Sequence, residues 1–439
     1  MPVVETGAPL SSSWYCPGAP AASDPAGGTG VVSVLNPGDT ANDGTLTVYP
    51  SEGEPKTMPL AVGGRARVDV RLAEVAVAPW AAAIVELIGA EGVVEQSAAG
   101  PTGRSTTACA NSAGSTWYFA EGATTVDASL SLLLFNPFPD DAILDLSFTT
   151  TEGTRQPQAT QGYVVRGQSV RLLTLDDIVR REPIVATTVS ARNGRVVAGR
   201  VQTYAQGQKR GFSVSLASPV PADQWWFASG DKGDRAAERI SLFNPGDLDA
   251  EVDVAFYPAD PSTVPPDQIN TPIAVTVPAK TAISVDVKEN ADVPAGQHSI
   301  LVQSEQDQPV VAERVLELQG DTAFNVTLQP GSPLTATSWT FVTGAADGSE
   351  ALVVANATGQ EVDVTVRALG PAGFMAVSGL ESVKVPAAGT LRVDLDEKGL
   401  AGLPIIVDGT VSVVAERVIA APAGQLGIGV SRGIPTIGP

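Results

Sequence analysis

The sequence predicts an all-β protein, a tandem array of four Ig-like antiparallel β-sandwich repeats. A short phrase that begins with tryptophan returns at Trp14, Trp117, Trp225 and Trp339, at spacings of 103, 108 and 114 residues. Between these positions, short runs alternate apolar and polar residues with period two, which is typical of strands with one buried face. A unit of about a hundred residues can bury its own core, so four such units fit the 439-residue chain.

The tryptophans set the predicted boundaries. Repeat 1 covers 14–116, repeat 2 covers 117–224, repeat 3 covers 225–338 and repeat 4 covers 339–439, after an N-terminal tail at 1–13. The phase stays open, because each tryptophan strand could instead close the preceding repeat. The four tryptophans recur at one position of the repeat, so we expect them in the core.

A strand that ends in asparagine follows each tryptophan by 17 to 22 residues. The asparagines are Asn36, Asn136, Asn244 and Asn356. In repeats 1 and 3 the strand continues into Asn-Pro-Gly-Asp, where asparagine caps its own turn, proline sets φ and glycine accepts a positive φ. These asparagines are therefore predicted to be structural turn residues.

Two further turns recur later in each repeat. The first is a corner between strands, as at 277–280 and 385–388. The second is predicted to be a tight hairpin turn at Glu91-Gly92, Asn193-Gly194, 306–308 and Asp408-Gly409, with glycine second in three of the four. Strands at turn intervals of 8–12 residues, seven or eight per repeat, are typical of a β-sandwich.

An arginine ends the strand that follows the second turn in repeats 2, 3 and 4. These arginines are Arg200, Arg314 and Arg417, and a glutamate precedes the last two. One interpretation is a cross-strand ion pair on the surface, which contributes about 0–1 kcal/mol. The other is an arginine bound to backbone carbonyls where two repeats meet. Since Gly199 replaces the glutamate in repeat 2, the arginine is the more constrained residue, and we favour the structural role.

These motifs carry a resemblance to a known family. The phrase at Trp117–Gly122, the strand end at 134–137 and the strand at 413–417 resemble a family of actinobacterial envelope and secreted proteins of unknown function. The resemblance spans the whole chain and implies an exported, all-β repeat protein, with no catalytic residues to carry over. Repeat 1 departs from the pattern most, with Cys16-Pro17 in place of Phe-Ala and Glu95-Gln96-Ser97 in place of Ala-Glu-Arg.

The two cysteines, Cys16 and Cys109, both belong to repeat 1. Cys16 occupies the slot of Phe119 in the next repeat, and Cys109 lies near the end of the same repeat. The two ends of a sandwich meet, so we predict a disulfide that replaces a core contact and implies an oxidising compartment. The alternative is a pair of reduced, buried thiols.

The net charge and the hydropathy of the sequence limit the classes of partner and the cellular location that we expect. The net charge of −21 disfavours binding to nucleic acid or to anionic lipid. No apolar run is long enough to span a bilayer, and Met1 leads into Pro2 and Val3 without a signal-peptide pattern. We expect an extracellular or envelope location, reached by export, with membrane attachment only through an anchor outside this sequence.

The sequence offers little for catalysis, and we predict no cofactor and no catalytic or metal site. The single histidine, His298, is expected on the surface or at a strand end. The acidic loop 231–235 could bind calcium, but Lys232 and Arg235 neutralise it. Trp226 lies outside the repeated tryptophan position and could stack on a sugar ring. Three carboxylate pairs lie in turns, at 140–141, 176–177 and 394–397.

The leading hypothesis is a non-enzymatic structural, scaffold or binding protein of the bacterial cell envelope, whose partner is an envelope protein or polysaccharide. One alternative is a carbohydrate-binding accessory protein, which would need exposed aromatics such as Trp226. The second is a glycoside-active enzyme, which would need paired carboxylates in a cleft. Short proline-containing junctions predict an extended or gently curved array with small contacts between repeats.

Overall fold

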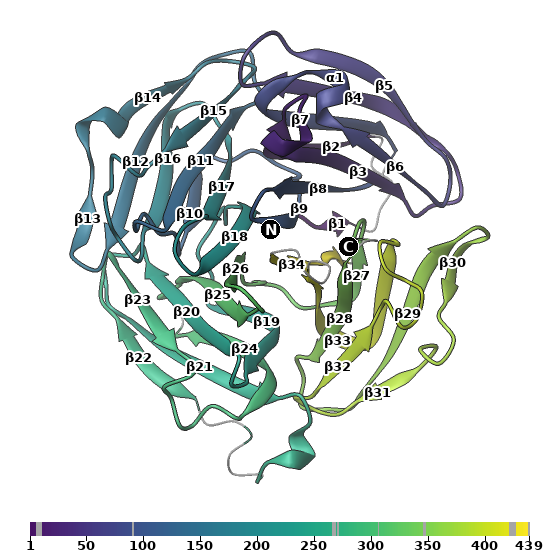
Figure 1. Ribbon diagram of the computed structural model, residues 1–439. Helices are drawn as coiled ribbons and strands as arrows, with labels where there is room; N and C mark the ends of the chain where they lie inside the picture. Colours follow the sequence, from purple (N-terminus) through teal and green to yellow (C-terminus); the bar gives the residue numbers. More distant parts are fainter. Residues whose placement is uncertain are drawn as a thin grey trace.

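The structure is a computed structural model that describes residues 1–5, 11–89, 92–265, 269, 272–305, 307–345, 348–420 and 427–437. The all-β prediction is confirmed, because strands dominate throughout (Figure 1). The described residues contain one short helix, α1 (Leu72–Val75), and three 3-10 turns, η1 (Pro25–Gly27), η2 (Gln158–Thr160) and η3 (Pro261–Thr263). Some strands alternate buried and half-buried residues, as at 142–147, and others are buried on both faces, as at 197–202.

In repeat 1, two four-stranded sheets make a sandwich. One sheet has the order β2–β7–β4–β5 and the other has the order β6–β3–β8–β9. Their strands are β2 (Ser11–Ala21), β3 (Thr29–Asn36), β4 (Asn42–Pro50), β5 (Lys56–Val62), β6 (Ala66–Arg71), β7 (Ala78–Ile88), β8 (Val93–Gly100) and β9 (Gly103–Ala108).

Repeat 2 repeats this topology. Its sheets run β10–β16–β12, with β13 and β14 beyond β12, and β15–β11–β17–β18. The tryptophan strand β10 pairs with β16 of its own repeat. The strands are β10 (Thr116–Phe119), β11 (Ala128–Asn136), β12 (Ala142–Thr150), β13 (Gly153–Arg155), β14 (Gln161–Val165), β15 (Ser169–Thr174), β16 (Ala186–Asn193), β17 (Val197–Tyr204) and β18 (Lys209–Leu216).

Repeat 3 has the sheets β19–β24–β21–β22 and β23–β20–β25–β26. Its tryptophan strand β19 likewise pairs within the repeat, with β24. The strands are β19 (Gln224–Lys232), β20 (Ala236–Asn244), β21 (Ala250–Pro258), β22 (Ile273–Val277), β23 (Thr281–Asp286), β24 (Gly296–Ser304), β25 (Val311–Gln319) and β26 (Phe324–Pro330).

Repeat 4 differs in one long strand that serves both sheets. The first part of this strand, β33, pairs with β27 and β29, and its second part pairs with β28 and β34. The strands are β27 (Ala336–Phe341), β28 (Ser349–Asn356), β29 (Val362–Gly370), β30 (Gly373–Ala376), β31 (Val383–Val385), β32 (Thr390–Asp394), β33 (Ile405–Ala420), β34 (Ile428–Arg432) and β35 (Ile434–Ile437).

The predicted tail is partly ordered against the last strand. β1 (Val4–Glu5) pairs in parallel with β35, and the tryptophan strand β2 already begins at Ser11. The central part of the tail, 6–10, lies outside the described residues.

The predicted hairpin turns are in fact corners between the two sheets. β16 belongs to one sheet and β17 to the other, and Gly194 joins them at φ +80°. In repeat 4 no turn interrupts the chain, because β33 continues through Asp408 and Gly409. Glu91 and Gln306 of the corresponding turns lie outside the described residues. The prediction was wrong because a turn glycine between two strands does not reveal which strand the second one pairs with.

The four sandwiches close into a ring (Figure 1). Four equivalent strands, β9, β18, β26 and β34, contact one another in cyclic order around the centre. β18 and β26 pair in parallel, so the sheets of repeats 2 and 3 merge into one eight-stranded sheet. The Ser105 hydroxyl of β9 accepts from the Val214 amide at 3.0 Å and donates to the Val214 carbonyl at 2.9 Å. Between β34 and β9, a Cβ on Gly427 would lie only 2.7 Å from the Cα of Gly103.

The ring contradicts the predicted extended array. Proline-containing junctions hold consecutive repeats close, as expected, but the rotation from one repeat to the next brings repeat 4 back against repeat 1. Among the described residues, a cavity of about 20 Å³ lies at the centre, bordered by β9, β18, β26 and β34 together with Met1 and Pro2. That is room for about one water molecule. The molecule is therefore a closed ring, here called the disc, rather than a stalk (Figure 1).

The corner that leads into β6, β15, β23 and β32 has the same backbone in all four repeats. Arg65, Gln168, Lys280 and Ala388 occupy it with φ between 52° and 56°. None of these is glycine, although L-residues resist the left-handed region by roughly 1–2 kcal/mol. The corner conformation is therefore imposed by the sandwich, since the next strand must cross to the other sheet.

We expect Ala388→Gly to stabilise the protein by up to about 1 kcal/mol, because glycine relieves the strain at φ 56°. The same chemical change at Ala274, an exposed residue in the regular strand β22, should destabilise by about 0.5–1 kcal/mol. Urea denaturation of the two variants gives the comparison. Equal effects of the two changes would show that the corner is unstrained.

Candidate functional site: buried junctions and two surface grooves

The repeated tryptophans lie in the cores, where they hold the tryptophan strand to the segment that enters the other sheet of the same repeat. The indole N–H groups of Trp117, Trp225 and Trp339 donate to the carbonyls of Val196, Val310 and Val413 at 2.8, 2.9 and 2.9 Å. Trp14 is buried at the same position of repeat 1, but its indole nitrogen has no hydrogen-bond partner among the described residues. Repeat 1 thus differs in bonding as well as in sequence.

The four repeated asparagines form identical clamps. In repeat 3, the Asn244 amide donates to the carbonyls of Leu248 at 2.8 Å and Val277 at 2.9 Å, and its oxygen accepts from the Gly246 amide at 2.8 Å. Asn36, Asn136 and Asn356 make the equivalent three bonds. Each clamp ties the turn after one strand to the corner that leads to the opposite sheet.

The three repeated arginines are fully buried and meet the tryptophan phrase. Arg200 bonds the carbonyl of Glu121, donates to Ser215 at 3.0 Å and lies over the Phe119 ring at 5.1 Å. Arg417 donates to the carbonyl of Thr343 at 3.2 Å. Arg314 lies over Phe227 at 5.5 Å. The arginines therefore fix the end of the tryptophan strand within their own repeats.

The neighbouring glutamates cross to the preceding repeat. Glu313 of repeat 3 accepts from the backbone amide of Glu121 in repeat 2 at 2.8 Å and pairs with Arg200 at 2.6 Å. Both side chains are about 1% exposed. The glutamate and the arginine are adjacent in the sequence pattern, but their partners lie in different repeats. Each such junction is thus an interlocking, buried pair.

Repeat 4 and repeat 1 supply the equivalent glutamates of the next two junctions. Glu416 accepts from the Ser229 amide of repeat 3 at 3.0 Å, and Glu95 of repeat 1 accepts from the Thr343 amide of repeat 4 at 2.9 Å. The contact at Glu95 closes the ring. Sequence reasoning missed the role of Glu95, because repeat 1 lacks the arginine that follows the glutamate elsewhere.

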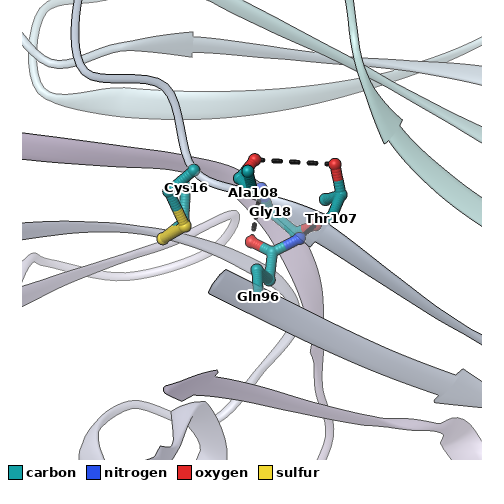
Figure 2. Close-up of a disulfide and its surroundings, with 6 residues drawn as sticks. Cys16, Gly18, Gln96, Thr107 and Ala108 are labelled. Carbon is teal, nitrogen blue, oxygen red and sulfur yellow. Dashed lines mark hydrogen bonds between the residues drawn. A yellow bond between two sulfur atoms is a disulfide. The ribbon is translucent and has the colours of Figure 1, made fainter. Parts of the chain in front are cut away.

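At the junction between repeats 1 and 2, close packing takes the place of the buried glutamate found at the other junctions. Gly199 stands where the other junctions have glutamate, and a Cβ there would lie 2.7 Å from the Pro17 ring. Gln96 takes the arginine slot, and its amide exchanges two hydrogen bonds with the backbone of Gly18, at 2.6 and 3.1 Å (Figure 2). Pro17 in repeat 1 and Gly199 in repeat 2 both differ from the residues at their positions in the other repeats. These two differences together are the sequence signal for the contact.

The predicted disulfide is confirmed beside this junction. Cys16 and Cys109 are bonded, and both are completely buried (Figure 2). Cys16 comes directly before Pro17, so the crosslink fixes the residue that packs on Gly199. The disulfide therefore supports the junction to repeat 2 as well as the core of repeat 1.

His298 is buried, which corrects the expected surface position, although it does lie near the start of β24. Its Nε2 is 2.9 Å from the Glu238 carboxylate, and its ring stands edge-on to Phe256. The other oxygen of Glu238 lies 3.5 Å from Arg314. Gly230 of the tryptophan phrase leaves the space for this pair, since a Cβ there would lie 2.6 Å from His298 Nε2.

Trp226 is not available as a sugar platform. It is 6% exposed, stacks on Tyr257 at 6.2 Å and belongs to the core cluster of repeat 4. It occupies the same position as Tyr118, which packs on Phe243 of the following repeat. Trp226 is therefore an aromatic of the repeat 3 to repeat 4 interface, and its place in the strand pattern does not distinguish this position from an exposed one.

Two open grooves lie at equivalent places in repeats 2 and 3. The first, of about 770 Å³, runs between the asparagine turn and the corner at Gly194, with Arg195 over the Phe138 ring at 4.7 Å. The second, of about 390 Å³, is lined by Tyr118, Leu248 and three prolines, Pro221, Pro245 and Pro309. Because β18 and β26 run parallel, both grooves open on the same side of the disc.

The carboxylate pairs act as turn acceptors. Asp141 accepts from the Gly167 amide at 2.9 Å, Asp176 from the Leu130 amide at 2.9 Å, and Asp394 from the Asp396 amide at 3.0 Å. The Asp140–Asp141 pair borders the larger groove, but both residues come from one exposed turn. In the loop 231–235, Asp231 accepts from the Gly233 amide at 2.7 Å, and Lys232 donates to two backbone carbonyls, at 2.5 and 2.9 Å.

The fold and its buried junctions define a closed array of β-sandwiches. The chain belongs to the family of unknown function DUF5719, whose sequence profile matches residues 95–350. No curated protein sequence matches it. No helix in the described part of the chain is long and apolar enough to cross a membrane.

Several solved structures show a distant likeness. Thermotoga maritima 1070 is 19% identical, with 26% of this chain and 94% of that chain covered and a TM-score of 0.22. The tetra-tandem repeat of the extending region of a large adhesion protein is 12% identical, with coverages of 95% and 98% and a TM-score of 0.10. The α-L-rhamnosidase of Streptomyces avermitilis, complexed with L-rhamnose, is 10% identical, with coverages of 88% and 55% and a TM-score of 0.14.

Proposed function

We propose that this protein is a non-enzymatic scaffold or binding protein of the bacterial cell envelope, which acts as a rigid disc outside the cytoplasm. The closed ring carries this proposal, because every recognised sequence motif is used to build and join the repeats. The disulfide between Cys16 and Cys109 is compatible with an oxidising, exported setting. The closed ring does not support a role as a stalk, because a ring does not extend the protein along one axis.

A protein partner is favoured over a polysaccharide. All the tryptophans, tyrosines and phenylalanines lie among the described residues, and each is buried or half-buried. Sugar recognition by stacking needs an accessible ring face, and Tyr118 is the half-buried aromatic that lines the second groove. The large apolar side chains that do reach solvent are aliphatic, among them Leu248 at the second groove, 71% exposed. Exposed apolar surfaces rimmed by polar residues mark sites of contact with proteins, membranes or ligands, and a protein is the partner we propose.

Crosslinking and affinity recovery from native envelope, read against a glycan array, tests this proposal. We expect a protein partner whose recovery falls at least tenfold in Leu248→Asp. Met375→Asp is the matched control, because Met375 is 60% exposed on β30 and borders neither groove. Specific glycan binding by the wild type would instead favour the carbohydrate-binding alternative. Equal loss in both variants would remove the grooves from the binding surface.

A further inference from the structure

The three ionic junctions differ in how well they satisfy the buried glutamate. Glu313 receives the guanidinium of Arg200 at 2.6 Å in addition to a backbone amide. Glu416 receives the Ser229 amide and hydroxyl, the Gln329 amide at 2.9 Å and, more distantly, Arg314 at 3.4 Å. Glu95, at the closing junction, receives one backbone amide, and its second oxygen is buried without a partner among the described residues.

The cations near Glu95 are committed elsewhere. Arg417, which holds the arginine slot of repeat 4, pairs with the buried Glu350 at 2.5 Å. Arg67 of β6 donates to the carbonyls of Val342 and Gly402 at 3.2 and 2.7 Å and lies 3.2 Å from Asp69. The Thr343 amide donates to the carboxyl group at 2.9 Å, and the Val342 amide also faces it. The carboxyl group is thus fully buried, with two arginines nearby and a salt bridge to neither.

We propose that the seam between repeats 4 and 1 is a pH-sensitive latch, which is tight while Glu95 is protonated and loosens when Glu95 ionises. A neutral carboxyl group suits this site, since an ionised one needs more donors than the seam offers. Glu313 differs from Glu95 in its ion pair with Arg200 at 2.6 Å, although its second oxygen also has no partner among the described residues. Glu416 differs because both of its oxygens accept hydrogen bonds. The inference concerns the ring itself and does not depend on the identity of a partner.

The pKa of Glu95 determines whether the seam opens at high or low pH, and over which pH range. Burial raises the pKa of Glu95 from its ordinary value of 4.5 to about 7, against the opposing pull of the two backbone amides, Arg417 and Arg67. An acid whose pKa is higher in the closed state favours closure at low pH and loses that contribution as pH rises from 4.5 to about 7. The opening constant of the seam should rise almost tenfold per pH unit in that window and level off above it.

Hydrogen exchange of the full chain, followed by mass spectrometry and corrected for the intrinsic pH dependence of exchange, measures this constant locally. Between pH 5.0 and 7.5 we expect opening of the segment around Thr343 to increase on the order of 50-fold. The segment around Ser229 is the control within the same molecule and should change little, because both oxygens of Glu416 at that junction accept hydrogen bonds. Equal pH dependence at both junctions would overturn the proposal.

Glu95→Gln provides the second arm. The glutamine oxygen can still accept from the Thr343 amide, so the ring should close, and the pH dependence of exchange at the seam should disappear. Persistence of that dependence in the variant would assign it to another group. If the variant fails to fold, an isotope-edited infrared spectrum of the wild type decides the question. A carboxylic acid band that vanishes near pH 7 supports the latch, and its absence at pH 5.5 contradicts it.

Discussion

Removing the disulfide should produce a loss of stability of about 4–5 kcal/mol, because Cys16 and Cys109 close a loop over a separation of 93 residues. The variant Cys16→Ala/Cys109→Ala keeps both positions small and apolar, as their complete burial requires. If the 439-residue ring unfolds as one unit, this loss lowers Tm by about 5 °C. Calorimetry and urea denaturation measure both quantities.

The location of the loss distinguishes the ring from a string of independent sandwiches. Cys16 precedes Pro17, which packs on Gly199 of repeat 2, so hydrogen exchange should quicken in both β8 and β17. A loss of protection confined to repeat 1 would mean that the junction is held by Pro17 alone. Unchanged stability would mean that the unfolded chain is already restricted without the crosslink.

The second large effect is expected from Arg200→Met. The substitution leaves the Glu313 carboxylate buried at the junction with a backbone amide only, and breaking a buried pair in this way typically costs about 3–5 kcal/mol. Burial already raises the pKa of Glu313, with Arg200 acting in the opposite direction. We therefore expect the variant to be more stable at pH 5 than at pH 8, a dependence that urea denaturation at the two values measures.

The double variant Arg200→Met/Glu313→Gln tests the explanation. Removing the charge of both partners should recover most of the stability and abolish the new pH dependence. Arg192→Met is the control, because its pair with Asp145 is largely exposed and should contribute little. If the double variant is as unstable as Arg200→Met, the loss comes from the bonds of Arg200 to Glu121 and Ser215 rather than from an unpaired charge.

Much of the fold of a single repeat could be predicted from the sequence, because it depends mainly on local sequence patterns. The alternation in strands such as β12 and the turn chemistry at Asn244 depend on residues close together in the chain. Cys16 and Cys109 could be paired because their slots in the repeat placed them at adjacent ends of one sandwich.

The arrangement of the units could not be predicted in the same way. Whether repeat 4 meets repeat 1 depends on a few degrees of rotation at each junction, and no single residue encodes that angle. The function of Glu95 was hidden for a related reason, since its partner Thr343 lies 248 residues away. Trp226 was misjudged because an aromatic that packs on the next repeat and one that faces solvent have the same place in the strand pattern.

The meeting of β9, β18, β26 and β34 at the centre has a consequence for biogenesis. Until repeat 4 has emerged, β9, the terminal strand of its sheet, lacks its contact with β34 and leaves a strand edge that is a template for pairing with a second chain. The contact that covers this edge joins distant parts of the sequence, and such contacts form late and slowly. Premature release or truncation within repeat 4 should therefore favour aggregation over a stable three-sandwich product, and a holdase that shields β-edges would act during this interval.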